Sequence, residues 1–456
     1  MLPEPKVRTG RNTEWDSNFG GDLMDDFAIK NGVLEKYPGD EREITVPEGV
    51  QEIGSGAFEG CSGLISITLP ESVTKIGSSA FAGCTGLIGI NLPEGVREIG
   101  DQAFEGCRSL ASMTLPEGVT KIGCGAFKNC GGLKNISIPD SVTKIGHEAF
   151  RNCSRLTGME IPAGITNIEW STFAGCRGLT GMTIPEGVKE IGSHAFEGCS
   201  GLTNITIPES VREIGDNAFE GCSALTAVIL PEGVKSIGSC AFMNCTLLSY
   251  FRMPDSVTEF GFRAFDGCGM LKRVRIKNYK SKPGYLPDYS TLDRLDGECG
   301  SDYTAVDGVV FNRDRSELVR YSALKDEAKY TIPAGIKKIG MYAFSNNQHL
   351  TEVIIPDGVT EIGGRAFENC QNLQSITIPP SVTYMGNYVF IGIHTSFNSR
   401  QQKVSGSINL KAPVKSIISA IERRSTAEDI LIRGKKGSEA ERYARQNGCT
   451  FEYTEM

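Results

Sequence analysis

The sequence contains no long hydrophobic run and no excess of basic residues. No segment reaches about 18 consecutive apolar residues, the length that a helix needs to cross a bilayer. The 456 residues carry 55 acidic and 47 basic side chains, whereas a protein that binds nucleic acid or anionic lipid over a broad surface shows a basic patch or stripe. We therefore expect neither a membrane span nor a nucleic-acid partner.

Residue types that perform catalysis or hold metals are scarce. The chain has only four histidines, His147, His194, His349 and His394. It contains no phosphate-binding glycine loop, no Cys/His cluster with metal-ligand spacing and no nucleophile elbow. These absences predict a protein that is not an enzyme and that holds no metal or cofactor.

The N-terminal segment lacks a hydrophobic core as well. Residues Met1 to Lys6 are followed by polar residues, whereas a signal peptide carries about 7 to 15 apolar residues after a basic start. On this observation the protein either stays inside the cell or is a chain trimmed at Met1.

The dominant feature that the sequence does contain is a 23-residue repeat. One copy runs from Leu64 to Cys84. Three residue types recur at the same step, from Pro47 to Pro254, from Phe58 to Phe265 and from Cys61 to Cys268. A second run follows with Pro333, Pro356 and Pro379. A period of this length predicts one elongated solenoid rather than several globular domains, because each coil packs only against its neighbours.

Within one repeat, the pattern predicts a strand, a bend and a helical turn. Leu64, Ile67 and Leu69 point to the core and the residues between them alternate outward, as in a short strand that Pro70 ends. Gly77 permits a tight bend. The next apolar residues are spaced like one helical turn: Ala80, Phe81, Cys84 and Leu87. We therefore expect an α/β solenoid, with a parallel sheet on one side of the coils and short helical or 3-10 turns on the other.

The cysteines follow the same period. Ten of the 15 occupy one repeat position, and Cys370 takes the same place in the second run. Stacked coils lie about 4.8 Å apart, and parallel side chains at that spacing keep their Cβ atoms beyond the roughly 3.5 to 4.5 Å of a disulfide. We predict free, buried thiols stacked in the core.

The repeat Leu-x-x-Ile-x-Ile-Pro-x-x-Val-x-x-Ile-Gly-x-x-Ala-Phe-x-x-Cys resembles the BspA-like, or treponemal-type, class of leucine-rich repeats. The resemblance covers residues 47–276 and 333–392. It implies a curved right-handed solenoid with the parallel sheet on the concave face and the short turns on the convex face. It also implies a protein of the kind found mostly on bacterial cell surfaces, and in some protists, that serves adhesion and protein binding without a catalytic residue set.

The pattern divides the chain into six parts. These are a flexible N-terminal tail (1–22), a hairpin N-cap (23–46), a first array of repeats (47–276), an insert or linker (277–305), a hairpin with a second array (306–395), and a degenerate coil with a C-terminal cap (396–456). Asn31-Gly32 and Asp307-Gly308 each stand between apolar flanks, which is a strong hairpin signal. The same hairpin is therefore expected to open both arrays.

The C-terminal part predicts a degenerate coil at Ile408 and Leu410, a last strand at 430–432, and a helix-containing cap. Ser438 with Glu441 forms a capping-box signature at the start of that helix. Gly448 is placed to end the helix. The segment from Gly437 to Ala444 is also similar to the tail of many bacterial proteins of the resembled class.

The outward positions of the strands change character at the end of the first array. Over most coils they are small, neutral and polar, as at Ser66. They then become aromatic and basic, at Tyr250, Arg252, Arg273 and Arg275. Aromatic and arginine side chains are enriched at binding hot spots, so these four residues are the candidate ligand-binding site. The alternative is an internal junction, in which the acidic insert folds back and neutralises the arginines.

One pair of residues could support thiol chemistry. Cys124 and His147 occupy the same repeat position one coil apart, and a thiol beside an imidazole can become a reactive thiolate. In other coils the same position holds Ser55, Ser78 and Asp101, which favours chance placement.

The function expected from these features is non-enzymatic protein binding. We expect a monomeric, adhesin-like, secreted or surface protein of a bacterium, whose partner is host extracellular matrix or another surface protein. Two alternatives stay open. One is an intracellular scaffold or regulator, favoured by the missing signal segment and the free thiols. The other is a thiol-dependent enzyme that uses Cys124 and His147.

Overall fold

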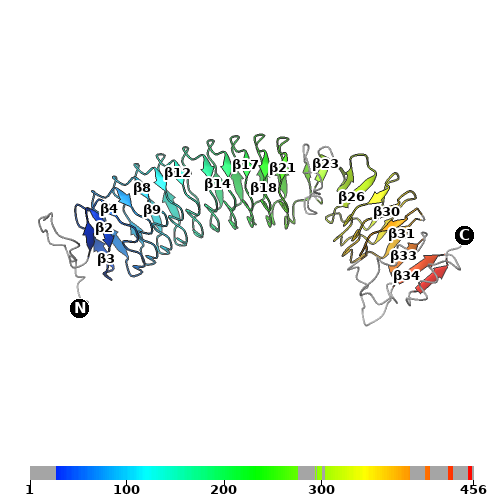
Figure 1. Ribbon diagram of the computed structural model, residues 1–456, viewed down its shortest axis with the longest axis horizontal. Coiled ribbons are helices and arrows are strands. Elements are labelled where there is room, and N and C mark those ends of the chain that lie inside the picture. The colour runs from blue at the N-terminus through cyan, green and yellow to red at the C-terminus, as the bar shows by residue number, and fades with distance from the viewer. Residues whose placement is uncertain are drawn as a thin grey trace. The chain divides into compact units, whose positions relative to one another are not determined.

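The computed structural model describes residues 27–275, 293, 295–299, 303–379, 381–390, 406–410, 430–434 and 450–453. The chain divides into two compact units, residues 1–271 and 272–456. In each unit successive coils stack side by side along the chain (Figure 1). The predicted tail at 1–22, most of the insert at 277–305 and the predicted cap helix at 438–448 lie outside the described residues.

The coils of the first unit are joined by two rows of parallel strands. The first row precedes the repeated proline and comprises β3 (Glu43–Thr45), β5 (Ser66–Thr68), β7 (Gly89–Ile90), β9 (Ser112–Thr114), β11 (Asn135–Ser137), β14 (Gly181–Thr183), β16 (Asn204–Thr206), β18 (Ala227–Ile229) and β20 (Tyr250–Arg252). The second row follows that proline and comprises β4 (Glu52–Ile53), β6 (Lys75–Ile76), β8 (Glu98–Ile99), β10 (Lys121–Ile122), β12 (Lys144–Ile145), β13 (Asn167–Ile168), β15 (Glu190–Ile191), β17 (Glu213–Ile214), β19 (Ser236–Ile237) and β21 (Glu259–Phe260). The sequence pattern had predicted only the first row.

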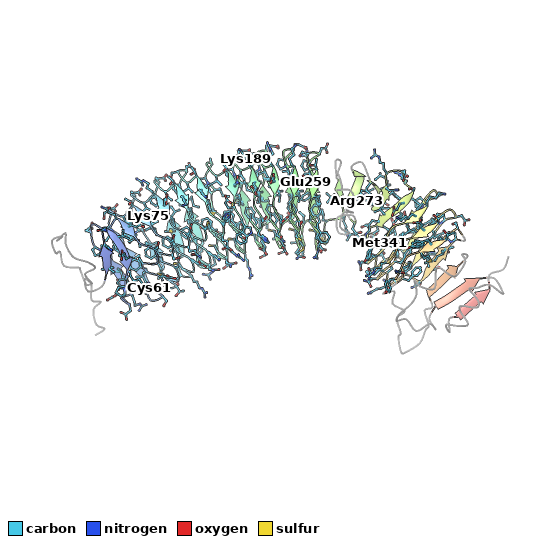
Figure 2. The ribbon with its side chains drawn as sticks, in the orientation of Figure 1. Cys61, Lys75, Lys189, Glu259, Arg273 and Met341 are labelled. Carbon is cyan, nitrogen blue, oxygen red and sulfur yellow. The ribbon has the colours of Figure 1, made fainter. Side chains whose placement is uncertain are left out.

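Pairing is in register with the repeat in both rows. Ile67 pairs with Ile90 in the first row, and Ile76 pairs with Ile99 in the second. In most strands of the second row the side chain before the buried isoleucine is exposed, as is Lys75 of β6, which Figure 2 labels. Because equivalent residues of neighbouring coils face one another, the isoleucines of the second row, from Ile53 to Ile237, form a continuous buried stripe.

The remaining side of each coil is a series of turns. The amide of Cys61 donates to the oxygen of Phe58 within the same coil, whereas the amide of Phe58 donates to Ala80 in the next coil. Gly56 and Gly60 adopt left-handed backbone angles, with φ of 64° and 77°. Because of these left-handed residues, alternate backbone amides point to the neighbouring coil and not along a helix axis. Among the described residues no helix is present, so the expected helical turns are not confirmed.

The core of the first unit is built from stacked phenylalanine and cysteine columns. The rings of Phe58 and Phe81 lie 5.2 Å apart and nearly parallel, at 2°, and stacking continues to Phe265. The Sγ atom of Cys84 donates to the backbone oxygen of Phe58 at 3.1 Å, and this bond recurs along the column. The cysteines from Cys84 to Cys268 at this position are free and buried, which confirms the predicted thiol stack except at Cys61, which is free but only partly buried.

The glycine that precedes the turns is required by the close approach of the coils. A Cβ atom on Gly77 would lie 2.8 Å from the carbonyl carbon of Gly54 and 2.8 Å from the oxygen of Ile53. Real Cβ atoms do not approach backbone atoms that closely. The repeated glycine therefore reflects backbone packing between coils in addition to the predicted bend.

Both predicted hairpins are present. Strands β1 (Ala28–Lys30) and β2 (Val33–Lys36) pair antiparallel around Asn31 and Gly32, and β2 pairs parallel with β4. In the second unit β24 (Tyr303–Val306) and β25 (Val309–Asn312) pair antiparallel around the Asp307-Gly308 turn. Strand β26 (Glu317–Tyr321) then continues into the parallel row through β28 (Lys338–Ile339).

The second unit repeats the two-row plan over fewer coils. Its other strands are β22 (Val274–Arg275), β23 (Leu295–Cys299), β27 (Lys329–Thr331), β29 (Glu352–Ile354), β30 (Glu361–Ile362), β31 (Ser375–Ile378), β32 (Tyr384–Met385), β33 (Gly406–Leu410), β34 (Ile430–Gly434) and β35 (Thr450–Tyr453). The expectation that 430–432 forms the last strand is wrong, because β35 pairs parallel with β34, Phe451 opposite Ile432. The alternating residues 450–453 are too short a run to stand out in the sequence.

Candidate functional site

The outward strand positions are exposed along the first row, as the alternation predicts. In β5, Ser66 and Thr68 are exposed and Ile67 is buried. The same order holds in β9 and β11. These neutral side chains form a polar surface over the strands, against which any larger side chain stands out.

Large side chains replace this polar surface in β18 and β20. Ile229 is 56 % exposed and Tyr250 is 54 % exposed. In the parallel pairing, Ile229 lies opposite Arg252 and Ala227 opposite Tyr250. The guanidinium of Arg252 lies 3.4 Å from Glu232, and both side chains are more than half exposed, so this ion pair contributes little. The first unit thus presents an aromatic, an aliphatic and a basic side chain on two adjacent strands.

The other two predicted site residues belong to the second unit. Arg273 directly precedes β22 and Arg275 ends it, and β22 pairs parallel with β23. The Nη2 atom of Arg273 lies 2.9 Å from Oδ1 of Asp307. A hydrogen bond from Lys325, with a further contribution from Arg273, holds the pKa of Asp307 below its usual value. The four candidates therefore divide between two units, with Tyr250 and Arg252 in one and Arg273 and Arg275 in the other.

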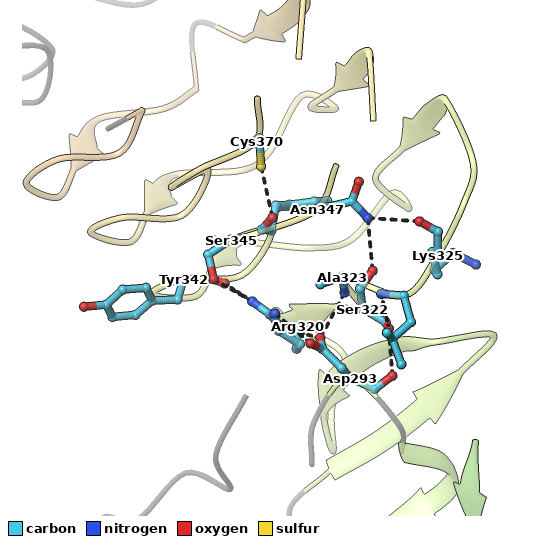
Figure 3. A network of polar contacts seen from close by, with 11 residues as sticks. Asp293, Arg320, Ser322, Ala323, Lys325, Tyr342, Ser345, Asn347 and Cys370 are labelled. Carbon is cyan, nitrogen blue, oxygen red and sulfur yellow. Dashed lines mark hydrogen bonds and ion pairs between the residues drawn. The ribbon is translucent and has the colours of Figure 1, made fainter. Parts of the chain in front are cut away.

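The insert contributes one described acidic side chain, and that side chain binds a different arginine. Asp293 accepts two hydrogen bonds from Arg320, at 2.6 Å from Nε and 3.0 Å from Nη2. Arg320 Nη1 also donates to the oxygen of Tyr342 at 2.6 Å and to Ser345 at 2.8 Å. Figure 3 shows this network around the guanidinium. This pair lies within residues 272–456 and involves none of the arginines of the candidate site. Of those arginines, Arg273 pairs with Asp307 of the hairpin.

Sequence reasoning missed Arg320, although a signal was present. The residue is 1 % exposed and stands among the buried Leu318, Val319 and Tyr321 of β26. A single arginine within an apolar strand indicates a buried charge that needs a partner. What the sequence could not supply was the partner, because Asp293 lies in an aperiodic segment.

The thiol pair of Cys124 and His147 is not assembled as a reactive centre. The backbone amide of Cys124 donates to Asp101 at 2.8 Å. The His147 ring faces Glu169, at 3.4 Å from Nδ1, and no hydrogen bond joins the ring to the Cys124 thiol in this described part of the chain. Among the stacked thiols, burial raises the pKa of Cys176 to about 12, which is opposite to the activation that a nucleophile requires.

The described residues contain neither a metal-ligand cluster nor a membrane-spanning helix. No group of three His, Cys, Asp or Glu side chains in them is placed to hold a metal ion. They also include no helix with the length and apolar character needed to span a membrane.

Two rows of in-register parallel strands, repeated every 23 residues over buried leucine, phenylalanine and cysteine columns, define a leucine-rich-repeat solenoid. The chain belongs to the BspA type leucine rich repeat family, whose six-copy region matches residues 37–157, 144–272 and 323–413. No curated protein matches the chain.

The chain is similar to solved structures of leucine-rich repeat proteins. A leucine-rich repeat protein from Bacteroides ovatus is 25 % identical, with a TM-score of 0.58, and the match covers 95 % of this chain and 100 % of that one. The T. pallidum leucine rich repeat protein is 28 % identical over 54 % of this chain and 86 % of its own, with a TM-score of 0.33. A leucine rich cell surface protein from Faecalibacterium prausnitzii is 25 % identical over 97 % and 96 %, with a TM-score of 0.31. The first of these supports a common fold over nearly the whole chain.

Proposed function

We propose that this protein is a non-enzymatic, adhesin-like protein of the bacterial surface that binds a protein partner through the outward face of its strands. The proposal rests on the repeat family and on the side chains of β18 and β20. Ile229, Tyr250 and Arg252 replace small polar residues on a surface that otherwise repeats closely.

The chemistry of these side chains fits a protein partner. Tyrosine and arginine are enriched at hot spots because each offers a large contact area together with directional donors. An exposed isoleucine beside them adds apolar area that gains free energy when a partner covers it. Nothing in the fold requires these three side chains, because equivalent strands such as β5 and β9 carry serine and threonine.

The test replaces Tyr250 and Arg252 with residues that another coil carries at the same repeat positions. Asn204 and Thr206 of β16 occupy the positions of Tyr250 and Arg252, so Tyr250→Asn with Arg252→Thr should fold normally. Binding of the full chain to immobilised fibronectin, laminin and collagen is measured by biolayer interferometry. We expect the variant to raise Kd at least about tenfold for the bound protein, since loss of hot-spot residues costs about 2 kcal/mol or more.

Two further variants complete the design. Arg273→Asn with Arg275→Thr examines the two predicted site residues that lie in residues 272–456 and should leave Kd unchanged if the face of β18 and β20 is sufficient for binding. Tyr384→Glu removes a similarly exposed tyrosine from β32 and should leave Kd unchanged. If the Tyr384 variant weakens binding as much as the Tyr250 variant, or if no matrix protein binds, the proposed site is wrong.

An intracellular scaffold is the second candidate, and one observation favours it. Cys124 is an exposed free thiol, which is more usual in reducing compartments than outside the cell. Treating intact cells with a protease that cannot enter them separates the two locations. Digestion of this chain supports the surface proposal, and full protection supports the scaffold.

A further inference from the structure

A polar hollow lies at the edge where the turns of the first unit lead into the strands. It has a volume of about 430 Å³. Its lining comes from three consecutive coils and consists of Arg108, Asn129, Gly131, Gly132, Asn152 and Arg155. No aromatic or aliphatic side chain is among these residues. The hollow therefore differs from the face of β18 and β20, where large apolar groups are exposed.

Two asparagines at the centre of the hollow replace a residue that is glycine in most other coils. Asn129 and Asn152 have left-handed backbone angles, with φ of 61° and 60°. Nδ2 of Asn152 donates to Oδ1 of Asn129 at 2.9 Å. The Nδ2 group of Asn129 and the Oδ1 atom of Asn152 form no further hydrogen bond with described residues. The pair thus retains one donor group and one acceptor for a ligand.

The two arginines of the hollow carry charge that the described residues do not neutralise. Arg108 and Arg155 are exposed and form no ion pair within the described part of the chain. The neighbouring cations differ, because Lys128 and Arg151 both bind Glu148, the first at 2.7 Å. Two guanidinium groups therefore stand beside the amide pair with their donors available.

The same chemistry continues along the stack. A second hollow of about 400 Å³ shares Asn152 and contains Arg177 of the following coil. Its one carboxylate, Glu197, lies 3.0 Å from Nδ1 of His194. Coils are 5.4 Å apart between the rings of Phe104 and Phe127, and 5.5 Å in the next step. A linear ligand lying along the stack would meet an arginine at intervals.

We propose that this edge binds an acidic polysaccharide, whose carboxylate or sulfate groups contact Arg108, Arg155 and Arg177 and whose hydroxyl groups contact the two asparagines. Guanidinium groups bind such oxyanions with two parallel hydrogen bonds. Side-chain amides both donate and accept, as sugar hydroxyls do. The missing apolar anchor argues against a protein ligand at this position. This glycan site is separate from the proposed protein-binding face in its residues and in its ligand.

The experiment uses the full chain and four polymers. Heparin supplies sulfate groups, polygalacturonate supplies carboxylates on sugars, dextran is neutral, and poly-L-glutamate supplies carboxylates without sugars. Isothermal titration calorimetry at physiological ionic strength should detect binding of heparin or polygalacturonate and no binding of dextran. Tighter binding by poly-L-glutamate than by both acidic glycans would assign the surface to acidic protein instead.

Variants use residues that the repeat already contains. Ser62 and Ser109 occupy the positions of Arg108 and Arg155 in other coils, so Arg108→Ser with Arg155→Ser preserves the fold. We expect Kd for the bound glycan to rise about tenfold or more, which corresponds to about 1.4 kcal/mol. Gly131→Gln fills the hollow without a change of charge and should also weaken binding, since Arg177 shows that its backbone accepts a long side chain.

The matched control removes the same charge elsewhere. Arg97 and Arg212 are exposed arginines at one repeat position of the same unit, where Thr74 and Thr120 stand in other coils. Arg97→Thr with Arg212→Thr should leave Kd unchanged. If this control variant raises Kd by as much as the Arg108 and Arg155 variant, binding comes from general electrostatic attraction and the proposed site is wrong. The Tyr250 and Arg252 variant should also bind glycan normally, so failure of one proposal is distinguishable from failure of the other.

Discussion

Each buried cysteine at the repeat position donates its thiol proton to the oxygen of a phenylalanine 26 residues earlier. Cys153 donates to Phe127 at 3.1 Å, and Cys176 donates to Phe150 at the same distance. Cysteine suits this position because it is small and apolar yet supplies a weak donor to a buried carbonyl group. The column therefore fills the core and satisfies backbone acceptors at once.

Because these thiols are buried, the free energy of unfolding should vary with pH in the alkaline range. Burial raises the pKa of Cys222 from 9.0 to about 12, so above pH 9 the unfolded chain releases a proton that the folded chain retains. The free energy of unfolding should fall between about pH 9 and 12, by about 1.4 kcal/mol per pH unit for each such thiol. Urea unfolding across this range should show a shallower fall in Cys222→Ala. The control Val211→Ala lowers stability without removing a thiol and should keep the original slope. An unchanged slope in the cysteine variant would contradict the linkage.

The buried pair of Asp293 and Arg320 should matter far more than the exposed pair of Asp307 and Arg273. Asp293→Ala leaves the guanidinium of Arg320 buried without a counter-charge, which should destabilise the second unit by about 3 to 5 kcal/mol. Asp307→Asn removes a carboxylate that is 63 % exposed. Of its partners, Arg273 is 59 % exposed and Lys325 keeps Glu327 at 3.0 Å, so the substitution should cost less than about 1 kcal/mol. Chemical denaturation followed by far-ultraviolet circular dichroism measures both. Similar losses in the two variants would show that burial does not govern these pairs.

At the scale of the residue, the sequence predicts the residues that recur at one repeat position better than the residues that depart from the repeat. A residue that recurs at one repeat position, such as the cysteine from Cys84 to Cys268, can be assigned to the core from its period alone. Asn347 replaces that cysteine in the second unit and is fully buried. Its Nδ2 donates to Ser322 and Lys325, and its Oδ1 accepts from the amides of His349 and Leu350. Ser322 and Lys325 lie in the segment after β26, which no period describes.

At the element scale, three sides of each coil bond to the next coil, and the sequence signal differs among them. The first strand row alternates buried and exposed residues over three or more positions, so it could be predicted. The second row has only two residues in each strand, too few for alternation. The turns depend on left-handed residues, yet that position is occupied by Ser79 and Gln102 as well as by Gly56. Contacts between coils therefore impose this conformation on several residue types. Because glycine does not mark the position consistently, the sequence pattern favours a helical turn there.

The close approach at Gly77 provides a test of coil packing. Gly77→Ala places a Cβ atom 2.8 Å from the backbone of the preceding coil, and the coils must separate to admit it. We expect a loss of about 2 kcal/mol or more, as in overpacked cores. Gly89→Ala in β7 is the control, because no atom lies within 4 Å of its Cβ position. That variant should be neutral or slightly stabilising. Urea midpoints decide the question, and equal midpoints for the two variants would argue against tight coil contact at Gly77.

At the scale of the whole molecule, each compact unit carries its own antiparallel hairpin before its parallel rows. Strands β1 and β2 precede β4 in residues 1–271, and β24 to β26 precede β28 in residues 272–456. A hairpin covers the first coil, whose buried residues and backbone donors would otherwise face water. Each unit therefore contains what a repeat stack needs in order to begin folding by itself.

This arrangement predicts two separate unfolding transitions. Both tryptophans, Trp15 and Trp170, belong to residues 1–271, so tryptophan fluorescence follows that unit alone, whereas circular dichroism follows both. In urea the two signals should not coincide. Phe150→Ala removes a ring from the buried stack of the first unit and should move the fluorescence transition to lower urea, by about 3 to 5 kcal/mol in stability. Asp293→Ala should move only the second component of the circular dichroism curve. A single transition that coincides in both signals, and that both variants shift equally, would mean that the two units unfold as one cooperative system.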